Sequence, residues 1–130
     1  MIYLDTSALV KLVFEEAESA ALVRWLEGRR DVPKLSSEVA TIELVRTCRR
    51  RILDALAGAR QVLAGLDLIP LGADIVEGAA LAEPVQLRSL DAIHLASALA
   101  LSDALTAFVV YDVRLRSAAE QAGLAVVTPA

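Results

Sequence analysis

The sequence predicts a three-layer α/β/α sandwich with a central, mostly parallel sheet. Short segments that are apolar throughout alternate with longer segments of helical spacing, and strands of this kind belong to parallel sheets covered on both faces. The 130 residues, 56% of them apolar, are enough to bury a core without metal or disulfide staples, and they exclude a disordered chain. We therefore expect one domain spanning residues 1–130.

In the first half of the chain, each predicted strand is followed by two predicted helices. The first apolar run ends at Asp5, and the hydroxyls of Thr6 and Ser7 can accept hydrogen bonds from free amides at a helix start. Pro33 favours the start or edge of a strand, and Gly65 favours a helix end. The expected elements are strands at residues 2–4 and 32–35, and helices at residues 8–14, 15–29, 38–51 (capped by Ser36 and Ser37) and 52–64.

In the second half of the chain, helix breakers and caps again separate the predicted elements. Pro84 ends one helix, Ser89 is expected to cap the next, and Gly123 closes the last. The clearest apolar strand ends at Asp112. The expected elements are strands at residues 68–71, 108–111 and 124–127, and helices at residues 74–83, 90–104 and 113–122.

Charge and composition exclude several classes of protein. A net charge of −4 and only five aromatic residues argue against a basic surface that coats nucleic acid and against a row of base-stacking rings. The longest uncharged run, residues 92–102, has 11 residues, whereas a membrane-spanning helix needs about 20. Asp5 interrupts any targeting segment at the N-terminus. The single cysteine, Cys48, fits a reducing cytosol, so we expect a cytoplasmic protein without a membrane partner.

Two aspartates follow apolar strands directly. Asp5 comes after the first predicted strand and Asp112 after the strand at residues 108–111. In open parallel sheets, ligands bind beyond the carboxyl ends of the strands, so these carboxylates are candidate ligands or catalytic groups. The alternative for each one alone is an ordinary turn or cap aspartate.

Two further carboxylates lie within predicted helices. Asp91 shares a helix face with Leu95, where an unpaired charge is costly; the alternative is an acid favoured by the helix dipole near an N-terminus. Glu43 lies at the edge of an apolar face beside Arg46 and Arg50. Its alternative is a salt bridge to these arginines, worth about 0.3–0.5 kcal/mol.

As a set, these four carboxylates indicate a metal site. Four converging carboxylates repel one another unless cations lie between them. Ligation by oxygen alone selects hard ions such as Mg²⁺ or Mn²⁺. A pair of such ions about 3.5–4 Å apart can generate a hydroxide and stabilise the leaving oxygen of a phosphoryl displacement. An acidic protein could thus bind RNA locally, through metal.

The whole chain resembles the PIN-domain ribonucleases, specifically the VapC toxins of bacterial toxin–antitoxin pairs. The resemblance is carried by residues 3–11 (YLDTSALVK), 36–44 (SSEVATIEL), 90–98 (LDAIHLASA) and 108–115 (FVVYDVRL). It implies a PIN-like fold and endonucleolytic cleavage of RNA with Mg²⁺ or Mn²⁺. It also implies a homodimer and a small VapB-type antitoxin that silences the toxin. The residues that would bind metal and catalyse cleavage are Asp5, Glu43, Asp91 and Asp112, with Ser7 and Thr6 as supporting hydroxyls.

The resemblance also suggests contact surfaces. Arg46, Arg50 and Arg114 are candidate RNA contacts, the alternative being solvated arginines near helix ends. An apolar surface on the first two helices is a candidate groove for an amphipathic antitoxin helix, the alternative being core packing. The residues expected to line that groove are Leu9, Leu12, Val13 and Trp25.

One departure from the family pattern keeps other functions open. Val110 stands where many relatives have a Thr or Ser two residues before the last aspartate. A catalytically weakened PIN-like module that acts through protein contacts is therefore one alternative. A housekeeping RNA-processing nuclease of the same fold is another. The single histidine, His94, is expected to pack or hydrogen-bond near Asp91 rather than to act as a base.

Overall fold

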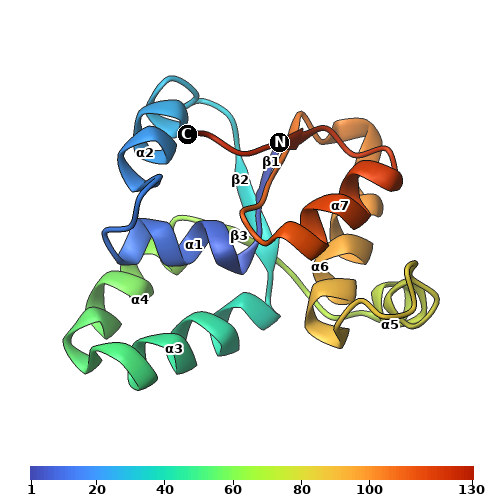
Figure 1. Ribbon diagram of the computed structural model, residues 1–130, viewed down its shortest axis with the longest axis horizontal. Helices are drawn as coiled ribbons and strands as arrows, with labels where there is room; N and C mark the ends of the chain where they lie inside the picture. The colour runs from blue at the N-terminus through green and yellow to red at the C-terminus, as the bar shows by residue number, and fades with distance from the viewer.

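The computed structural model describes residues 1–130 and has a parallel five-stranded sheet with the strand order β3-β2-β1-β4-β5. The predicted three-layer α/β/α sandwich is confirmed. Helices α1 to α4 cover one face of the sheet and α5 to α7 the other (Figure 1). The strands are β1 (Ile2–Leu4), β2 (Lys34–Ser37), β3 (Asp67–Ile69), β4 (Ala107–Val109) and β5 (Val126–Val127). The helices are α1 (Thr6–Val13), α2 (Ser19–Glu27), α3 (Val39–Arg51), α4 (Leu56–Ala64), α5 (Ala73–Ala80), α6 (Ser89–Leu99) and α7 (Val113–Gln121).

The sheet separates two apolar cores. Alternate residues of a strand point to opposite faces, so Ile2 and Leu4 of β1 join the cluster beneath α1, α3 and α4. Tyr3 joins the cluster beneath α6 and α7, where its ring stacks on Phe108 with 5.3 Å between centroids. Both central strands, β1 and β4, are buried along their whole length. This explains why they are apolar throughout rather than alternating.

The strand order places a ligand site between β1 and β4. From β1 the chain adds β2 and β3 on one side, and it later adds β4 and β5 on the other. Clefts for ligands form where the strand order reverses in this way, beyond the carboxyl ends of the strands. The residues that follow β1 and β4 therefore meet at the predicted edge. None of the helices combines the length and the apolarity that crossing a bilayer requires.

Several predicted caps are wrong. Asp5, not Thr6 or Ser7, caps α1, because its Oδ1 accepts from the Ala8 amide at 3.0 Å. Both serines expected to cap the third helix lie in β2, where the Ser36 hydroxyl donates to the carbonyl of Leu4 at 2.7 Å; only Ser37 contacts the helix start, its Oγ accepting from the Val39 amide at 3.3 Å. The tertiary contact of Ser36 outweighs the local preference of serine for caps. Ser89 makes no cap bond either.

Several predicted helices are shorter than expected, and those predicted for residues 74–83 and 90–104 end at Ala80 and Leu99. The helix predicted for residues 15–29 begins only at Ser19, whose hydroxyl donates to the Phe14 carbonyl and accepts from the Glu16 amide in a turn. The helix predicted for residues 52–64 is interrupted because Ile52 is extended, and a 3-10 helix precedes α4. The end predicted at Gly123 is confirmed, with a φ of 85° that suits glycine.

Candidate active site

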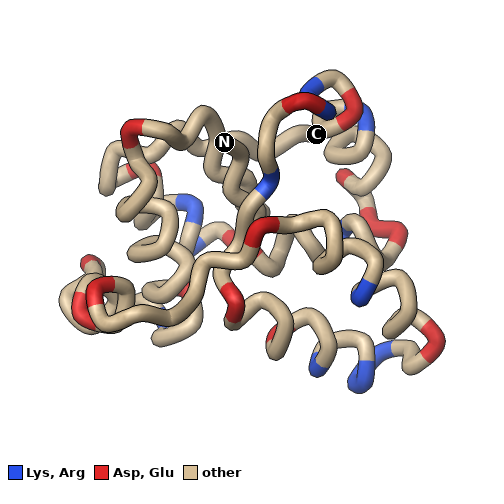
Figure 2. Tube along the Cα trace, turned by 180° about the vertical axis from the view of Figure 1, so that it is seen from behind, with Lys and Arg blue, Asp and Glu red and all other residues tan.

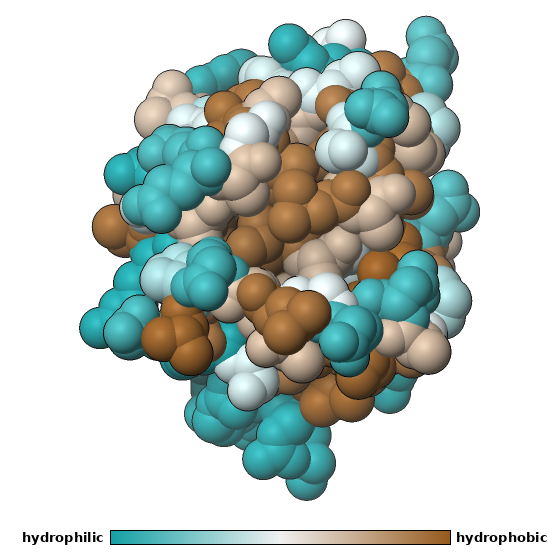
Figure 3. Space-filling model, turned by 90° about the vertical axis from the view of Figure 1, so that its right-hand side faces the viewer, coloured by the Kyte–Doolittle hydropathy of each residue, from teal (hydrophilic) through white to brown (hydrophobic).

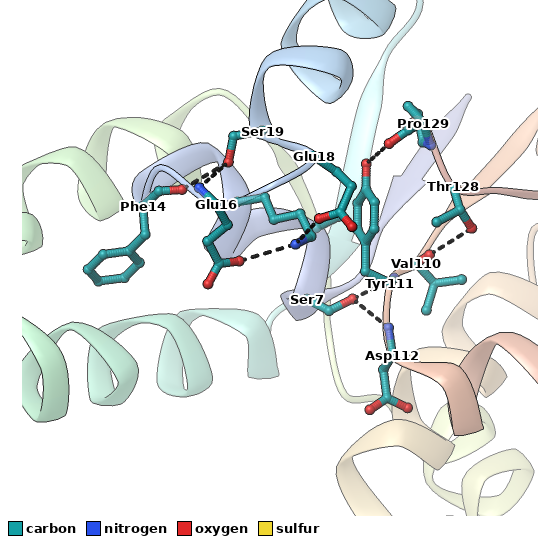
Figure 4. A network of polar contacts seen from close by, with 12 residues as sticks. Ser7, Phe14, Glu16, Glu18, Ser19, Val110, Tyr111, Asp112, Thr128 and Pro129 are labelled. Atoms are coloured by element: carbon teal, nitrogen blue, oxygen red, sulfur yellow. Dashed lines mark hydrogen bonds and ion pairs between the residues drawn. The ribbon is translucent and has the colours of Figure 1, made fainter.

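The serine hydroxyl of Ser7 joins the carboxyl ends of β1 and β4. Its Oγ donates to Asp5 Oδ1 at 2.6 Å. The same oxygen accepts from the backbone amides of Tyr111 at 2.8 Å and Asp112 at 3.2 Å. Figure 4 shows Ser7 reaching these two amides, with the Asp112 carboxylate pointing away from it. One side chain thus fixes the two strand-end aspartates relative to each other.

Asp5 carries a charge in an unfavourable place. Its side chain is buried, and burial raises the pKa of the carboxyl to about 6, although His94 and the hydrogen bonds from Ser7 and Ala8 act in the opposite direction. Burial disfavours the charged form because water no longer solvates it. A cation beside Asp5 would stabilise the carboxylate.

Glu43 is held by a network that crosses from α3 to α6. Its Oε1 accepts from Thr6 Oγ1 at 2.8 Å and lies 2.7 Å from His94 Nε2. Since a carboxylate only accepts hydrogen bonds, Nε2 donates. The other ring nitrogen, Nδ1, lies 2.8 Å from the Tyr3 hydroxyl. Burial opposes the charge on Glu43, but the bonds from His94 and Thr6 lower its pKa on balance.

This network identifies the partners of His94 and removes one alternative for Glu43. His94 is fully buried on the helix of Asp91, and its hydrogen-bond partners are Glu43, Thr6 and Tyr3. Glu43 makes no ion pair with Arg46 or Arg50. The contact joins residues 51 positions apart, so helical spacing on one element could not reveal it.

Asp91 and Asp112 share an arginine that the sequence analysis missed. Arg88 Nε lies 3.0 Å from Asp91 Oδ2, and its Nη2 lies 3.6 Å from Asp112 Oδ2. The hydrogen bond to Asp91 is the main reason that the pKa of Arg88 is raised, and Asp112 and Glu43 add to it. The i,i+3 spacing of Arg88 and Asp91 at a helix start was the available signal. The second Asp112 oxygen, Oδ1, caps α7 through the Leu115 amide.

These contacts connect the four candidate carboxylates through shared neighbours. Ser7 links Asp5 to the backbone amide of Asp112, Arg88 links Asp112 to Asp91, and Thr6, the residue after Asp5, hydrogen-bonds to Glu43. No three Asp, Glu, His or Cys side chains lie close enough to form a ready-made metal cluster. The donor set nevertheless fits a hard divalent cation, because it offers only carboxylate oxygens as charged ligands and two of these residues, Asp5 and Asp91, are buried.

Val110 contributes to the core rather than to the site. Its side chain is fully buried among Tyr3, Leu95 and Leu115. Its polar contacts are made by the backbone: the carbonyl accepts from Thr128 Oγ1 at 3.1 Å, and the amide donates to the Val127 carbonyl at 3.3 Å. The hydroxyl groups that touch the candidate carboxylates come instead from Ser7 and Thr6.

The three arginines expected to contact RNA lie outside the quartet. Arg46 and Arg50, together with Arg49, line a hollow of about 260 Å³ on α3. Figure 2 shows basic residues gathered along the C-terminal half of this helix. Arg114 lines a separate hollow of about 330 Å³ with Leu87 and Ser117. None of the three makes an ion pair with a candidate carboxylate.

The expected antitoxin groove is partly wrong. Leu9 is fully buried in the core beneath α1 and cannot line a surface. Leu12 and Val13 do line an open groove of about 520 Å³ between α1 and α2, together with Val23. Trp25 is half-buried against the core, and the Arg29 guanidinium covers its ring at 4.0 Å.

Comparisons with known proteins agree with this architecture. The model of the PIN domain family matches residues 2–121. Ribonuclease VapC35 of Mycobacterium tuberculosis is 47% identical over 131 residues, which cover 99% of this chain and 97% of the relative. Ribonuclease VapC46 of the same species is 42% identical over 128 residues, with 98% and 97% covered.

Two solved structures share the fold. A toxin–antitoxin complex from Klebsiella pneumoniae superposes with a TM-score of 0.69 at 23% identity, covering 100% of this chain and 98% of the other. VapBC2 from Rickettsia felis, bound to a DNA fragment from its promoter, gives a TM-score of 0.75 at 14% identity, with 100% of both chains covered. These likenesses establish the fold over the full described chain.

Proposed function

The chain belongs to the PIN-domain family and, within it, to the VapC ribonucleases, and we propose that it is a metal-dependent endoribonuclease acting as the toxin of a toxin–antitoxin pair. The observation that carries the assignment of the site is the Ser7 junction, which fixes Asp5 and Asp112 at the switch point of the sheet. Arg88 and the Glu43–His94 pair extend that junction to the other two carboxylates.

We assign metal binding and catalysis to Asp5, Glu43, Asp91 and Asp112. Bound Mg²⁺ or Mn²⁺ would supply a nucleophilic hydroxide and stabilise charge on the leaving oxygen of the phosphodiester. The protein's own residues prepare for this chemistry. Ser7 orients the Asp5 carboxylate, and Thr6 and His94 fix Glu43 in its charged form, as partners of metal ligands commonly do.

The remaining partners are proposed from surfaces. We assign RNA contacts outside the metal site to Arg46 and Arg50, because their hollow on α3 is the basic one. RNA as substrate and Cys48 as a buried free thiol both fit action in the cytoplasm. We assign an amphipathic antitoxin helix to the groove lined by Leu12 and Val13.

A homodimer is proposed through the face formed by α5, α6 and α7. Figure 3 shows apolar side chains gathered in a hollow on this side of the molecule. The hollow measures about 390 Å³ and is lined by Leu81, Ala96 and Leu99 among others. The Leu81 side chain is 71% exposed, and burying such apolar surface favours self-association. Light scattering measures the molar mass of the antitoxin-free protein in solution. We expect a dimer for the wild type and a monomer for the Leu81→Glu variant.

Cleavage of total bacterial RNA tests the enzymatic assignment. Purified, antitoxin-free protein is incubated with Mg²⁺, Mn²⁺ or EDTA, and the Asp5→Asn variant is treated in parallel. We expect discrete cuts by the wild type alone, lost in EDTA. The matched control is Asp103→Asn, because Asp103 is exposed and lies before β4, at the opposite edge of the sheet. Cuts that persist in Asp5→Asn would refute the assignment.

Two measurements separate the two alternative functions, a binding module without turnover and a housekeeping nuclease. A binding module without turnover would show no rise in melting temperature on titration with Mn²⁺, because a ligand stabilises only the state that binds it. A housekeeping nuclease would cleave RNA without arresting growth on induction. The toxin assignment therefore requires a Mn²⁺-dependent thermal shift and growth arrest that the Asp5→Asn variant lacks.

A further inference from the structure

Arg88 is the one arginine or lysine that forms ion pairs with the candidate carboxylates. Its Nε lies 3.0 Å from Asp91 Oδ2, and its Nη2 lies 3.6 Å from Asp112 Oδ2. Through them it couples the start of α6 to Asp112, the N-cap residue of α7. The arginine therefore bridges two elements of the site that the chain brings together only on folding.

The guanidinium is held by charge rather than by packing. The side chain of Arg88 is 67% exposed, whereas those of Asp91 and Asp112 are 12% and 32% exposed. Arg88 is the N-cap residue of α6 in extended backbone conformation, and its side chain makes no cap bond. Only the backbone of Arg88 is fixed, by its position at the start of α6. A guanidinium exposed to this extent can exchange its partners without disturbing the core.

A divalent ion ligated by Asp91 and Asp112 would compete with this arginine. Arg88 uses Oδ2 of both residues, while Oδ1 of Asp112 is already committed to the Leu115 amide. Two cations cannot share the same oxygens without repulsion. Ion binding would therefore release the guanidinium while its backbone keeps it beside the site.

A released arginine at this position is suited to a phosphate. Guanidinium groups bind phosphate oxygens in a bidentate manner and are weakly hydrated. The proposed reaction brings an RNA phosphate to the carboxylates that Arg88 touches. Arg46, Arg50 and Arg114 form no ion pair with those carboxylates, so Arg88 is the arginine in direct contact with the groups to which the phosphate would come.

We propose that Arg88 is an exchangeable cation, which pairs Asp91 with Asp112 in the metal-free protein and contacts an RNA phosphate when divalent ions occupy the site. The inference rests on the proposed ribonuclease function and adds a substrate-contacting residue to it. It makes two linked claims. Removing the guanidinium strengthens metal binding, and it weakens RNA binding.

The test uses Arg88→Gln and Arg88→Lys, with Arg30→Gln as the matched control. Arg30 also pairs with a carboxylate three residues away, at 3.7 Å from Glu27, but lies at the end of α2 away from the site. Mn²⁺ binding without RNA is measured by calorimetry. Binding of a labelled, mixed-sequence single-stranded RNA is measured by anisotropy with Ca²⁺ as the oxygen-seeking ion, over a range of salt concentrations, with the RNA checked to be intact.

We expect Arg88→Gln to bind Mn²⁺ about two- to fivefold more tightly, as the loss of a competing exposed ion pair implies. Its RNA affinity falls about tenfold, as for a lost charged hydrogen bond. The slope of log affinity against log salt falls by about 0.7, the value for one phosphate contact on a single strand. Arg88→Lys keeps the salt slope, because it keeps the charge, and Arg30→Gln matches the wild type in all three quantities.

Two results would overturn the inference. Weaker Mn²⁺ binding by Arg88→Gln would make Arg88 a support of the ligands instead of a competitor. An unchanged RNA affinity and salt slope would exclude the phosphate contact. If the wild type cleaves RNA and binds Mn²⁺, either of these results refutes the role of Arg88 but not the proposed function. A wild type that does neither refutes the proposed function. Circular dichroism melting in EDTA verifies that each variant is folded, as the exposure of Arg88 predicts.

Discussion

Replacing Asp5 by asparagine removes one buried negative charge without removing the cap of α1. The Asn side-chain carbonyl can still accept from the Ala8 amide and the Ser7 hydroxyl, which lie 3.0 and 2.6 Å from Asp5 Oδ1. The change therefore isolates the charge. We expect the variant to lose metal-dependent cleavage while the metal-free protein becomes more stable.

The magnitude follows from the pKa of Asp5. Burial raises it from 3.8 to about 6 in the folded protein. Because the folded pKa lies above the unfolded one, the stability contributed by neutral Asp5 is complete below 3.8 and is lost as the pH rises through about 6. At about 1.4 kcal/mol per pH unit, the full loss is about 3 kcal/mol. Asp5→Asn avoids this loss, so its advantage is about 3 kcal/mol at pH 8 and about half of that at pH 5.

Urea unfolding in EDTA at pH 5 and pH 8 measures this difference. Glu43 does not contribute to the difference between pH 5 and pH 8, because its lowered pKa keeps the folded protein's Glu43 charged at both pH values. Adding Mn²⁺ at pH 8 should raise the melting temperature of the wild type but not that of the variant. A variant whose stability in EDTA follows the wild type at both pH values would show that the Asp5 charge is already compensated without metal.

Two further substitutions test the framework of the site. Ser7→Ala leaves the Tyr111 and Asp112 amides without their acceptor, so we expect a loss of about 1–2 kcal/mol in urea unfolding and about tenfold weaker Mn²⁺ binding by calorimetry; unchanged Mn²⁺ affinity would contradict the role of Ser7. Gly123→Ala forces a side chain into a φ of 85° with no atom within 4 Å of the added Cβ, so the cost of about 1 kcal/mol is purely conformational and should appear in thermal unfolding without altering cleavage.

The layers of the fold and the strand-end aspartates were predictable because they depend on local sequence. An apolar run followed by Asp5 or Asp112 signals both a buried strand and a polar group at its carboxyl end. Cap predictions were wrong where a side chain made a tertiary contact instead. Ser36, for example, donates to the Leu4 carbonyl and does not cap a helix. Hydrophobic spacing also could not tell which side of an apolar helix faces inward, so Leu9 was placed on a surface although it is fully buried.

The supporting residues of the site were harder to foresee because their partners are distant in sequence. His94 hydrogen-bonds to Glu43, 51 positions away, and to Tyr3, 91 positions away. Arg88 reaches Asp112 from another element. Each side chain has an unremarkable local explanation, and only the packing of α6 against the sheet reveals what it touches.

The central position of β1 has a consequence for biosynthesis. This strand is made first, yet it pairs with β4, and Ser7 bonds to an amide 105 positions further along the chain. Contacts of such separation form late and slowly, because the intervening loop must close before they stabilise anything. An emerging chain carries Asp5 and Glu43 long before Asp112 can join them. We therefore expect a nascent or truncated chain that ends before β4 to lack the proposed site and to leave RNA intact, including the message from which it is being translated.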